Sequence, residues 1–262
     1  MLQTLTSPVL MNLTAEASYM LFHHAPDLRA RMVSGGVMVL TGEPYADFNV
    51  ILIESPRPKV GEHLTQWVGE AKALGLPFIV LIAPEAATGL AKTCESLGLN
   101  LAGSMPFMVC EATGFQVISN LDLMVNKVAD ERDWYDVAVP LAKANNLTEK
   151  SVRRSLPQAL VENPAVDLYL ARDKDGAPVG CVLLTSHGEV RGVWSMAVHP
   201  NHQRKGYGRA MLTQVMDEHH RLFGAKAFFL GSSPNGVGLY QRIGFRTIAE
   251  APLWVKGETS QV

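Results

Sequence analysis

Cysteine is scarce in this sequence, and its three residues, Cys94, Cys110 and Cys181, show no paired spacing. A disulfide framework needs an even set of cysteines, and a zinc site needs ligands at short, fixed intervals. Neither pattern is present. Each cysteine stands in an apolar stretch, so we expect three small buried side chains in a protein from a reducing compartment.

Charge of one sign and long apolar runs are also missing. The formal net charge is -2 and no dense stretch of lysine and arginine occurs, so we expect no nucleic-acid partner. The N-terminus lacks a basic segment followed by an apolar one, and no apolar run reaches the roughly 18 residues that cross a bilayer. We therefore expect a cytoplasmic protein without a membrane partner.

The residues that are present favour two globular domains. Of 262 residues, 47% are hydrophobic and 18% charged, which is enough apolar material for two cores of ordinary size. Strand and helix patterns alternate over residues 36–111 and again from residue 117 to the end, where a strand is expected over 117–125 and helices over 131–145 and 148–161. This alternation predicts an α/β (α+β) fold in both halves.

The two halves share a pattern. Leu74-Gly75 is followed by a strand pattern, a helix pattern and Leu97-Gly98, and Phe223-Gly224 is followed by the same series, which ends in Ile243-Gly244. A closing strand pattern comes after each. The repeat predicts a duplicated fold, with chance similarity between two common strand-helix-strand units as the alternative.

A loop with the chemistry of an anion site follows the strand pattern that ends at Val198. Pro200 stops this strand, and residues 203–208 are Gln-Arg-Lys-Gly-Tyr-Gly before a helix pattern begins at Arg209. Glycines at a helix start let an anion approach unpaired amide groups, and basic side chains add positive charge. The loop lacks the glycine spacing of a P-loop or a dinucleotide fingerprint. It predicts a phosphate or pyrophosphate site, unless the glycines merely shape a turn.

Two motifs resemble the GNAT superfamily of acyl-CoA-dependent N-acetyltransferases. Residues 203–208 match the family's Q/R-x-x-G-x-G/A loop, and residues 239–245 match its L-Y-x-x-x-G-F helix end. The resemblance covers residues from about 117 to 262 and reaches the first half only through the repeat. It implies a GNAT-like mixed central sheet flanked by helices, in two tandem GNAT-like domains. Residues 1–114 would be a degenerate copy without the acyl-CoA loop, and residues 115–262 the acetyltransferase domain.

The activity that this resemblance implies is transfer of an acetyl or acyl group from acetyl-CoA to a primary amine of a small molecule or peptide. The amine would attack the thioester directly in a ternary complex, because no cysteine or serine stands in a nucleophile motif. Acetyl-CoA would be the cosubstrate, with no metal, and a homodimer is compatible with the resemblance. A non-catalytic acyl-CoA-binding sensor or regulatory protein is the alternative, and an enzyme that modifies lysines of a partner protein is another.

The resemblance also implies roles for single residues. Tyr240 would act on the departing thiolate, although it could instead be a tyrosine packed in the core. A phenol is a weaker acid than a thiol, so Tyr240 would donate a hydrogen bond rather than a full proton. The strand edge and one serine would bind the pantetheine arm, and the loop amides the pyrophosphate. The expected acyl-CoA-binding residues are therefore Met196, Ala197, Val198, Gln203, Arg204, Lys205, Gly206, Tyr207, Gly208, Arg209 and Ser233.

A general base is needed because an alkyl amine is protonated at neutral pH, but the sequence does not assign one. Gly192 stands where several members of the family carry a glutamate, and no acidic residue occurs between Val190 and Val198. The remaining candidates are Glu189, His187 and His199. Each of these is expected more often as an exposed loop residue than as a base.

The first half lacks both motifs. Its strand end at Pro56 is followed by a short loop that contains Pro58, which has no amide to offer a phosphate, and Ala91 and Lys92 stand near the position of Tyr240. We expect this half to wall the acceptor pocket without binding coenzyme A. Its core is expected to hold Tyr45, Phe48 and Trp67, with His23-His24 at a solvated helix end.

Overall fold

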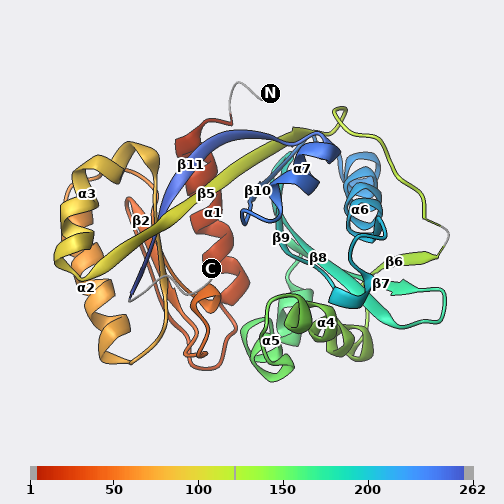
Figure 1. The fold of residues 1–262 in the computed structure, drawn as a ribbon, viewed down its shortest axis with the longest axis horizontal. Coiled ribbons are helices and arrows are strands. Elements are labelled where there is room, and N and C mark those ends of the chain that lie inside the picture. The colour runs from red at the N-terminus through yellow and green to blue at the C-terminus, as the bar shows by residue number, and fades with distance from the viewer. Residues whose placement is uncertain (1–4, 121, 257–262) are drawn as a thin grey trace. The chain divides into compact units, whose positions relative to one another are not determined.

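The computed structural model describes residues 5–120 and 122–256, which divide into two compact units (Figure 1). The N-terminal unit comprises the described residues up to 107 together with 231–234 and 247–256. The C-terminal unit comprises the described residues of 108–230 and 235–246. The predicted boundary near residue 114 lies close to the first passage between the units, and the later passages near the C-terminal end were not predicted.

The N-terminal unit is built on strands in the order β1-β2-β3-β4-β11-β5. The pairs β1·β2 and β2·β3 are antiparallel, β3·β4 is parallel, and β4·β11 is antiparallel. Every residue of β2, β3 and β4 is buried, as expected for central strands covered by helices on both faces. The elements are α1 (Ser7–Phe22), β1 (Arg29–Val33), β2 (Gly36–Leu40), η2 (Ala46–Phe48), β3 (Asn49–Ile53), α2 (Val60–Ala73), β4 (Ile79–Ile82), α3 (Pro84–Ser96), β5 (Leu99–Glu111) and β11 (Arg246–Lys256).

The core of this unit forms between α2, α3 and the strands, around the fully buried Trp67. Phe48 is also buried, as predicted, whereas Tyr45 is half-buried. His23 and His24 are exposed where α1 ends, as predicted. The start and length of helix α1 were not predicted, because apolar residues occur outside its buried face as well as on it and no clean helical stripe marks it.

The C-terminal unit has strands in the order β5-β10-β9-β8-β7-β6. Strands β6 to β9 are antiparallel neighbours, and β9·β10 is parallel. Helix α6 packs Met211, Leu212 and Val215 against one face, which includes Leu184 and Val193, and α4 lies on the other side of β8 and β9 (Figure 1). The elements are β6 (Leu123–Lys127), α4 (Glu131–Ala144), α5 (Glu149–Ser155), η3 (Gln158–Glu162), β7 (Val166–Asp173), β8 (Pro178–His187), β9 (Val190–Val198), η4 (Pro200–His202), α6 (Tyr207–Phe223), β10 (Ala227–Gly231) and α7 (Val237–Ile243).

Two expectations for this unit were wrong. The strand expected over 117–125 begins only at Leu123, and residue 121 lies outside the described residues. The Ile118 amide donates to the Thr213 hydroxyl at 3.1 Å, and the Gln214 side chain donates to the Ile118 carbonyl at 3.3 Å, so the preceding segment bonds to α6 instead of a strand. The helix expected over 148–161 breaks at Pro157 into α5 and η3, because proline removes a helical amide and restricts the residue before it.

The repeat is confirmed at the level of topology. The series β3, α2, β4, α3, β5 and the series β9, α6, β10, α7, β11 have the same order of elements. In each, the first two strands are parallel neighbours joined by the first helix. The predicted fold class, a mixed sheet flanked by helices, is therefore confirmed, and chance similarity of isolated segments is not needed to explain the repeat.

The three cysteines are buried free thiols, as predicted. No helix within residues 5–120 and 122–256 has the length and apolar character to cross a bilayer.

Candidate active site

The site begins where two parallel strands separate. β9 and β10 are paired from Val190 with Ala227 to Gly192 with Phe229. Beyond Gly192 the pairing with β10 ends, and β9 continues to Val198 while remaining paired with β8. The edge of β9 that faces away from β8 therefore offers backbone groups over the predicted pantetheine-binding residues 196–198.

A β-bulge lies in β9 just beyond this point. Cys181 pairs with Ala197 and Leu183 with Trp194, so Ser195 and Met196 together oppose one residue of β8. Ser195 has φ +47°, a left-handed conformation that is uncommon outside glycine. The extra residue turns the Met196 side chain toward the core beneath α6 and α7.

The predicted phosphate loop connects β9 to α6 through η4. The Gln203 side chain donates to the Val198 carbonyl at 3.1 Å, which fixes the loop to the strand end. Gly206 is the N-cap of α6 with φ +83°, and Arg204 has φ +60°. The first helical bond runs from the Ala210 amide to the Gly206 carbonyl, so the amides of the preceding helical residues have no partner inside the helix.

These loop residues fit a phosphate-bearing ligand. Arg204 and Lys205 are exposed beside the unpaired amides. Among the described residues, the buried Nε of Arg209 and the buried Nδ1 of His202 have no hydrogen-bond partner. The Arg209 Nε–H is always a donor, buried donors without partners are rare, and a bound anion would supply a partner. Sequence reasoning missed His202, whose ring stacks on the Tyr207 ring with centroids 6.1 Å apart.

Tyr240 lies beside the predicted pantetheine edge. Its hydroxyl donates to the Met196 sulfur at 3.6 Å, and its ring packs on Phe245 with centroids 5.7 Å apart. Burial raises the pKa of the phenol to about 12, so it is a neutral hydrogen-bond donor at physiological pH. Helix α7 ends at Gly244 with φ +122°, where a Cβ would collide with the Gly114 carbonyl oxygen, and this explains the glycine of the second motif.

Ser233 belongs to a different compact unit from the other predicted acyl-CoA-binding residues. It is exposed and lies in the stretch 231–234, which belongs to the N-terminal unit, whereas the loop, the β9 edge and Tyr240 belong to the C-terminal unit. Its contact with pantetheine stays a prediction.

The position of the missing glutamate is filled by other side chains. A Cβ at Gly192 would lie 2.5 Å from Trp194 Nε1 and 2.6 Å from Thr185 Oγ1. The indole N–H donates to the Thr185 hydroxyl at 2.7 Å, which holds both groups in that space. Sequence reasoning missed Thr185 and Trp194, because the contact depends on the pairing of Thr185 with Gly192 across two strands.

The three candidate bases lie in different surroundings. Glu189 forms an ion pair with Lys226, and its side chain is 55% exposed. His199 follows β9 at the loop, where its Nδ1 accepts from the Asn201 amide, and burial together with His202 and Lys143 lowers its pKa. His187 ends β8 with its Nε2 3.0 Å from Thr185 Oγ1.

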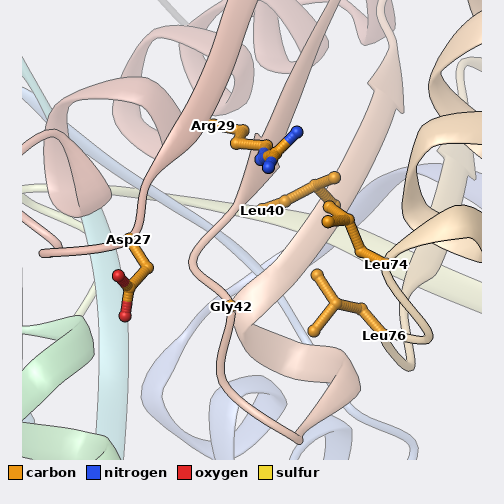
Figure 2. Close-up of a pocket in the computed structure, with 6 residues that line it drawn as sticks. All are labelled: Asp27, Arg29, Leu40, Gly42, Leu74 and Leu76. Carbon is orange, nitrogen blue, oxygen red and sulfur yellow. The ribbon is translucent and has the colours of Figure 1, made fainter.

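A pocket of the N-terminal unit lies elsewhere (Figure 2). Leu74 and Leu76 extend toward Leu40 in Figure 2, and none of the predicted acyl-CoA residues lines it. The pocket is lined by Asp27, Arg29, Leu40, Gly42, Leu74 and Leu76.

The N-terminal unit has a loop at the position that corresponds to the predicted phosphate loop. Its N-cap residue Lys59 is also left-handed, with φ +66°, but the loop is shorter and contains Pro58.

Comparison with known domains decides the family of the C-terminal part. Residues 164–247 match the family model described as an acetyltransferase (GNAT) domain. Residues 164–247 are a GNAT domain. This range contains the predicted phosphate loop, the diverging strands β9 and β10, and Tyr240. The family supports acyl transfer from an acyl-CoA in general. No curated protein sequence matches the chain significantly.

Solved structures show that the GNAT fold extends beyond this domain. A GCN5-related N-acetyltransferase from Kribbella flavida has 17% identity and a TM-score of 0.67, covering 97% of this chain and 96% of its own. A tandem GNAT protein from the clavulanic acid biosynthesis pathway has 13% identity and a TM-score of 0.59, covering 97% and 94%. A GCN5-related N-acetyltransferase from Sphaerobacter thermophilus has 16% identity and a TM-score of 0.58, covering 85% and 76%. At these identities the likeness shows the fold.

Proposed function

We propose that this protein transfers an acyl group, with acetyl as the first candidate, from acyl-CoA to a primary amine of a small molecule or peptide. The observation that carries the proposal is the placement of three features in one unit. The left-handed N-cap of α6 presents unpaired amides, β9 separates from β10 directly before that loop, and the Tyr240 hydroxyl lies at the β9 edge. Phosphate, pantetheine and thioester sulfur follow one another in the same order along coenzyme A.

In this proposal, backbone amides and positively charged side chains bind the acyl-CoA. The amides at the start of α6 and the side chains of Arg204, Lys205 and Arg209 would hold the pyrophosphate, because helix N-termini and guanidinium groups both favour anions. The β9 edge over 196–198 would hydrogen-bond the pantetheine amides as a neighbouring strand does. The buried Nε of Arg209, which has no partner among the described residues, supports this arrangement.

The chemistry follows from direct attack. A neutral amine nitrogen forms a bond to the thioester carbon, the C–S bond breaks, and the coenzyme A thiolate departs. Tyr240 would donate a hydrogen bond to the sulfur as negative charge develops there. Its pKa of about 12 is well above that of a thiol, so a hydrogen bond is favoured over complete proton transfer.

The cysteines support a ternary complex over a covalent acyl-enzyme. Burial raises the pKa of the Cys181 thiol to about 12 and those of Cys94 and Cys110 to about 11. A thiol is nucleophilic only as the thiolate, and these groups stay protonated near neutral pH.

A second candidate function is a non-catalytic acyl-CoA sensor. The observation that favours it is the occupied space at Gly192, which leaves no room for a glutamate base. The two functions differ in one measurement, because an enzyme releases free thiol from acetyl-CoA when a suitable amine is present and a sensor does not.

The proposed site can be tested by calorimetric titration with acetyl-CoA. Gly206→Asp places a carboxylate at the proposed phosphate site and should weaken binding by about 100-fold, since the charge repels phosphate and a side chain is strained at φ +83°. Gly224→Asp is the matched control, because Gly224 caps the other end of the same helix with φ +67° and equally open surroundings. Equal affinity in both variants, or no binding by folded wild type, would contradict the proposed site.

A further inference from the structure

We propose that Trp194 limits the length of the acyl group, so that the protein takes acetyl and other short acyl groups from coenzyme A and rejects medium-length chains. This inference rests on the proposed acyl transfer and narrows its donor to short-chain acyl-CoA. The feature that carries it is a pair of aromatic rings, Trp194 on β9 and Phe229 on β10, which meet where the two strands separate.

Trp194 lies at the closed end of the opening between β9 and β10. Gly192 and Phe229 form the last residue pair before the strands diverge. The Trp194 ring packs edge-on against the Phe229 ring, with centroids 5.7 Å apart and an angle of 86° between the ring planes. Phe229 itself is fully buried. The two rings therefore bridge the strands at the point where the opening begins.

A hydrogen bond to β8 holds the indole in this position. The indole N–H donates to the Thr185 hydroxyl at 2.7 Å, and Thr185 is fully buried and paired with Gly192. A Cβ at Gly192 would lie 2.5 Å from Nε1 and 2.9 Å from Cε2 of Trp194, so the ring occupies the space above the glycine. The ring cannot move aside without losing this hydrogen bond and its packing on Phe229.

The opening is also closed on the other face of the sheet. Val193 and Phe228 are buried in the core that α6 covers, and side chains alternate along a strand, so Trp194 and Phe229 point to the opposite face. Backbone pairing of Gly192 with Phe229 closes the space between the two strands. A chain that extends along the opening therefore meets packed side chains on both faces and hydrogen-bonded backbone between them.

The acyl group of the proposed ligand would extend toward this closed end. The pantetheine arm would lie along residues 196–198, and the Tyr240 hydroxyl marks the position of the sulfur at Met196. Trp194 precedes Met196 by two residues, which span about 6–7 Å in an extended strand, and apolar contact takes about 3.5–4 Å of that length. From the sulfur, an acetyl group extends about 3 Å and a hexanoyl chain about 8 Å. The space therefore fits the short group.

The test measures the affinity of the whole protein for acyl-CoA by calorimetry, which requires no acceptor amine. Wild type should bind hexanoyl-CoA at least 10-fold more weakly than acetyl-CoA, because extra methylenes in a filled site are unfavourable. Trp194→Ala should bind hexanoyl-CoA at least as tightly as acetyl-CoA, since each methylene buried in the vacated space raises affinity about fourfold. Trp194→Leu should change the preference in the same direction, and it replaces the alanine variant if that one does not fold.

Trp134→Ala is the matched control. Trp134 lies on α4 in the same unit, is half-buried like Trp194, and donates its indole N–H to the Leu156 carbonyl at 2.9 Å. Its loss removes an indole of similar burial and bonding but does not open the space between β9 and β10. The ratio of the two affinities in Trp134→Ala should therefore match that of wild type.

The outcomes separate this inference from the proposed function. A folded wild type that binds neither coenzyme A nor acetyl-CoA overturns both. Equal affinity of wild type for acetyl-CoA and hexanoyl-CoA leaves the proposed function standing and overturns the limit on chain length. The role of Trp194 is likewise overturned if its folded variants keep the wild-type preference, or if Trp134→Ala shifts that preference to the same extent.

Discussion

At the scale of single residues, Tyr240 shows how burial selects a chemical role. Its hydroxyl has a thioether as partner, which is a weak acceptor, and burial holds the phenol in its neutral form. Because the hydrogen bond to a thioether is weak, little free energy is lost when the hydroxyl donates instead to a stronger acceptor, such as a thiolate. The same burial makes it a poor acid, so its contribution is a hydrogen bond made as the sulfur becomes negative.

We therefore expect Tyr240→Phe to lower kcat by about 100-fold, the loss typical of one donor to developing negative charge. The dissociation constant for acetyl-CoA should stay within about threefold of wild type, because the ring and its packing on Phe245 are kept. Steady-state thiol release and calorimetry measure the two quantities. A parallel loss of affinity and rate would instead assign Tyr240 to packing.

Sequence could predict the residues whose role depends on local conformation. Gly206 and Gly208 stand in a motif because a helix start that binds phosphate needs glycine. The glycine of the second motif, Gly244, is explained by its close approach to Gly114, and the catalytic role of Tyr240 stays a prediction. Thr185 and Trp194 were not predictable, because their contact arises only when β8 and β9 pair and a bulge re-aims the strand.

At the scale of elements, α6 has different chemistry at its two ends. Its first turn carries the proposed phosphate site, and the buried His219 lies just before its last turn. The Arg191 Nε donates to His219 Nδ1 at 3.2 Å, His219 Nε2 lies 3.1 Å from the Tyr169 hydroxyl, and that hydroxyl donates to Glu218 at 2.8 Å. With Nδ1 acting as an acceptor, the ring is neutral with its proton on Nε2.

This arrangement predicts loss of stability in acid. Burial lowers the pKa of His219 to about 4, with Arg191 and Lys127 acting in the same direction against Asp167. The unfolded chain takes up the proton near pH 6.5 and the folded chain only near 4, so the free energy of unfolding should fall as pH drops through that window. His219 should account for about 3 kcal/mol of this loss.

Urea unfolding of wild type and His219→Gln across this window measures the effect. Glutamine does not titrate, so the variant is expected to be less stable than wild type at neutral pH and to lose less stability in acid. His220→Gln on the same helix turn is the matched control, since its ring is only partly buried. Parallel pH curves for wild type and His219→Gln would show that acid acts through other groups.

Element boundaries were predictable where apolar periodicity was strong. α6 begins two residues before the expected Arg209, because it presents a clear apolar stripe to its sheet. The segment before β6 was not predictable, since its partners are side chains of α6 almost a hundred residues later. Local sequence patterns do not indicate hydrogen bonds between residues so far apart.

At the scale of the whole molecule, the chain returns to its N-terminal unit near its C-terminal end. Residues 253–255 of β11 pair antiparallel with residues 79–81 of β4, and Trp254 belongs to the core that contains Trp67. The N-terminal unit therefore depends on residues far from the rest of it in sequence, whereas the C-terminal unit is nearly continuous over residues 108–246.

Trp254→Ala should thus destabilise the N-terminal unit by about 3–5 kcal/mol, as expected for removal of a large buried aromatic side chain. Trp254→Phe should cost much less, because it keeps an aromatic ring and removes an indole nitrogen that is buried without a hydrogen-bond partner among the described residues. Hydrogen exchange at β3 and β4 amides reports on this unit directly. Protection that is equal in both variants would contradict a core role for the strand.

The position of β11 also constrains how the protein is made. During translation, residues 5–107 emerge well before residues 253–255, yet the sheet of the N-terminal unit has a place between β4 and β5 that only the later residues fill. A domain made of contiguous sequence can fold as soon as it leaves the ribosome. Here the N-terminal unit leaves one edge of β4 unpaired until β11 has been synthesised. We therefore expect its sheet to be completed only after more than a hundred further residues have been added.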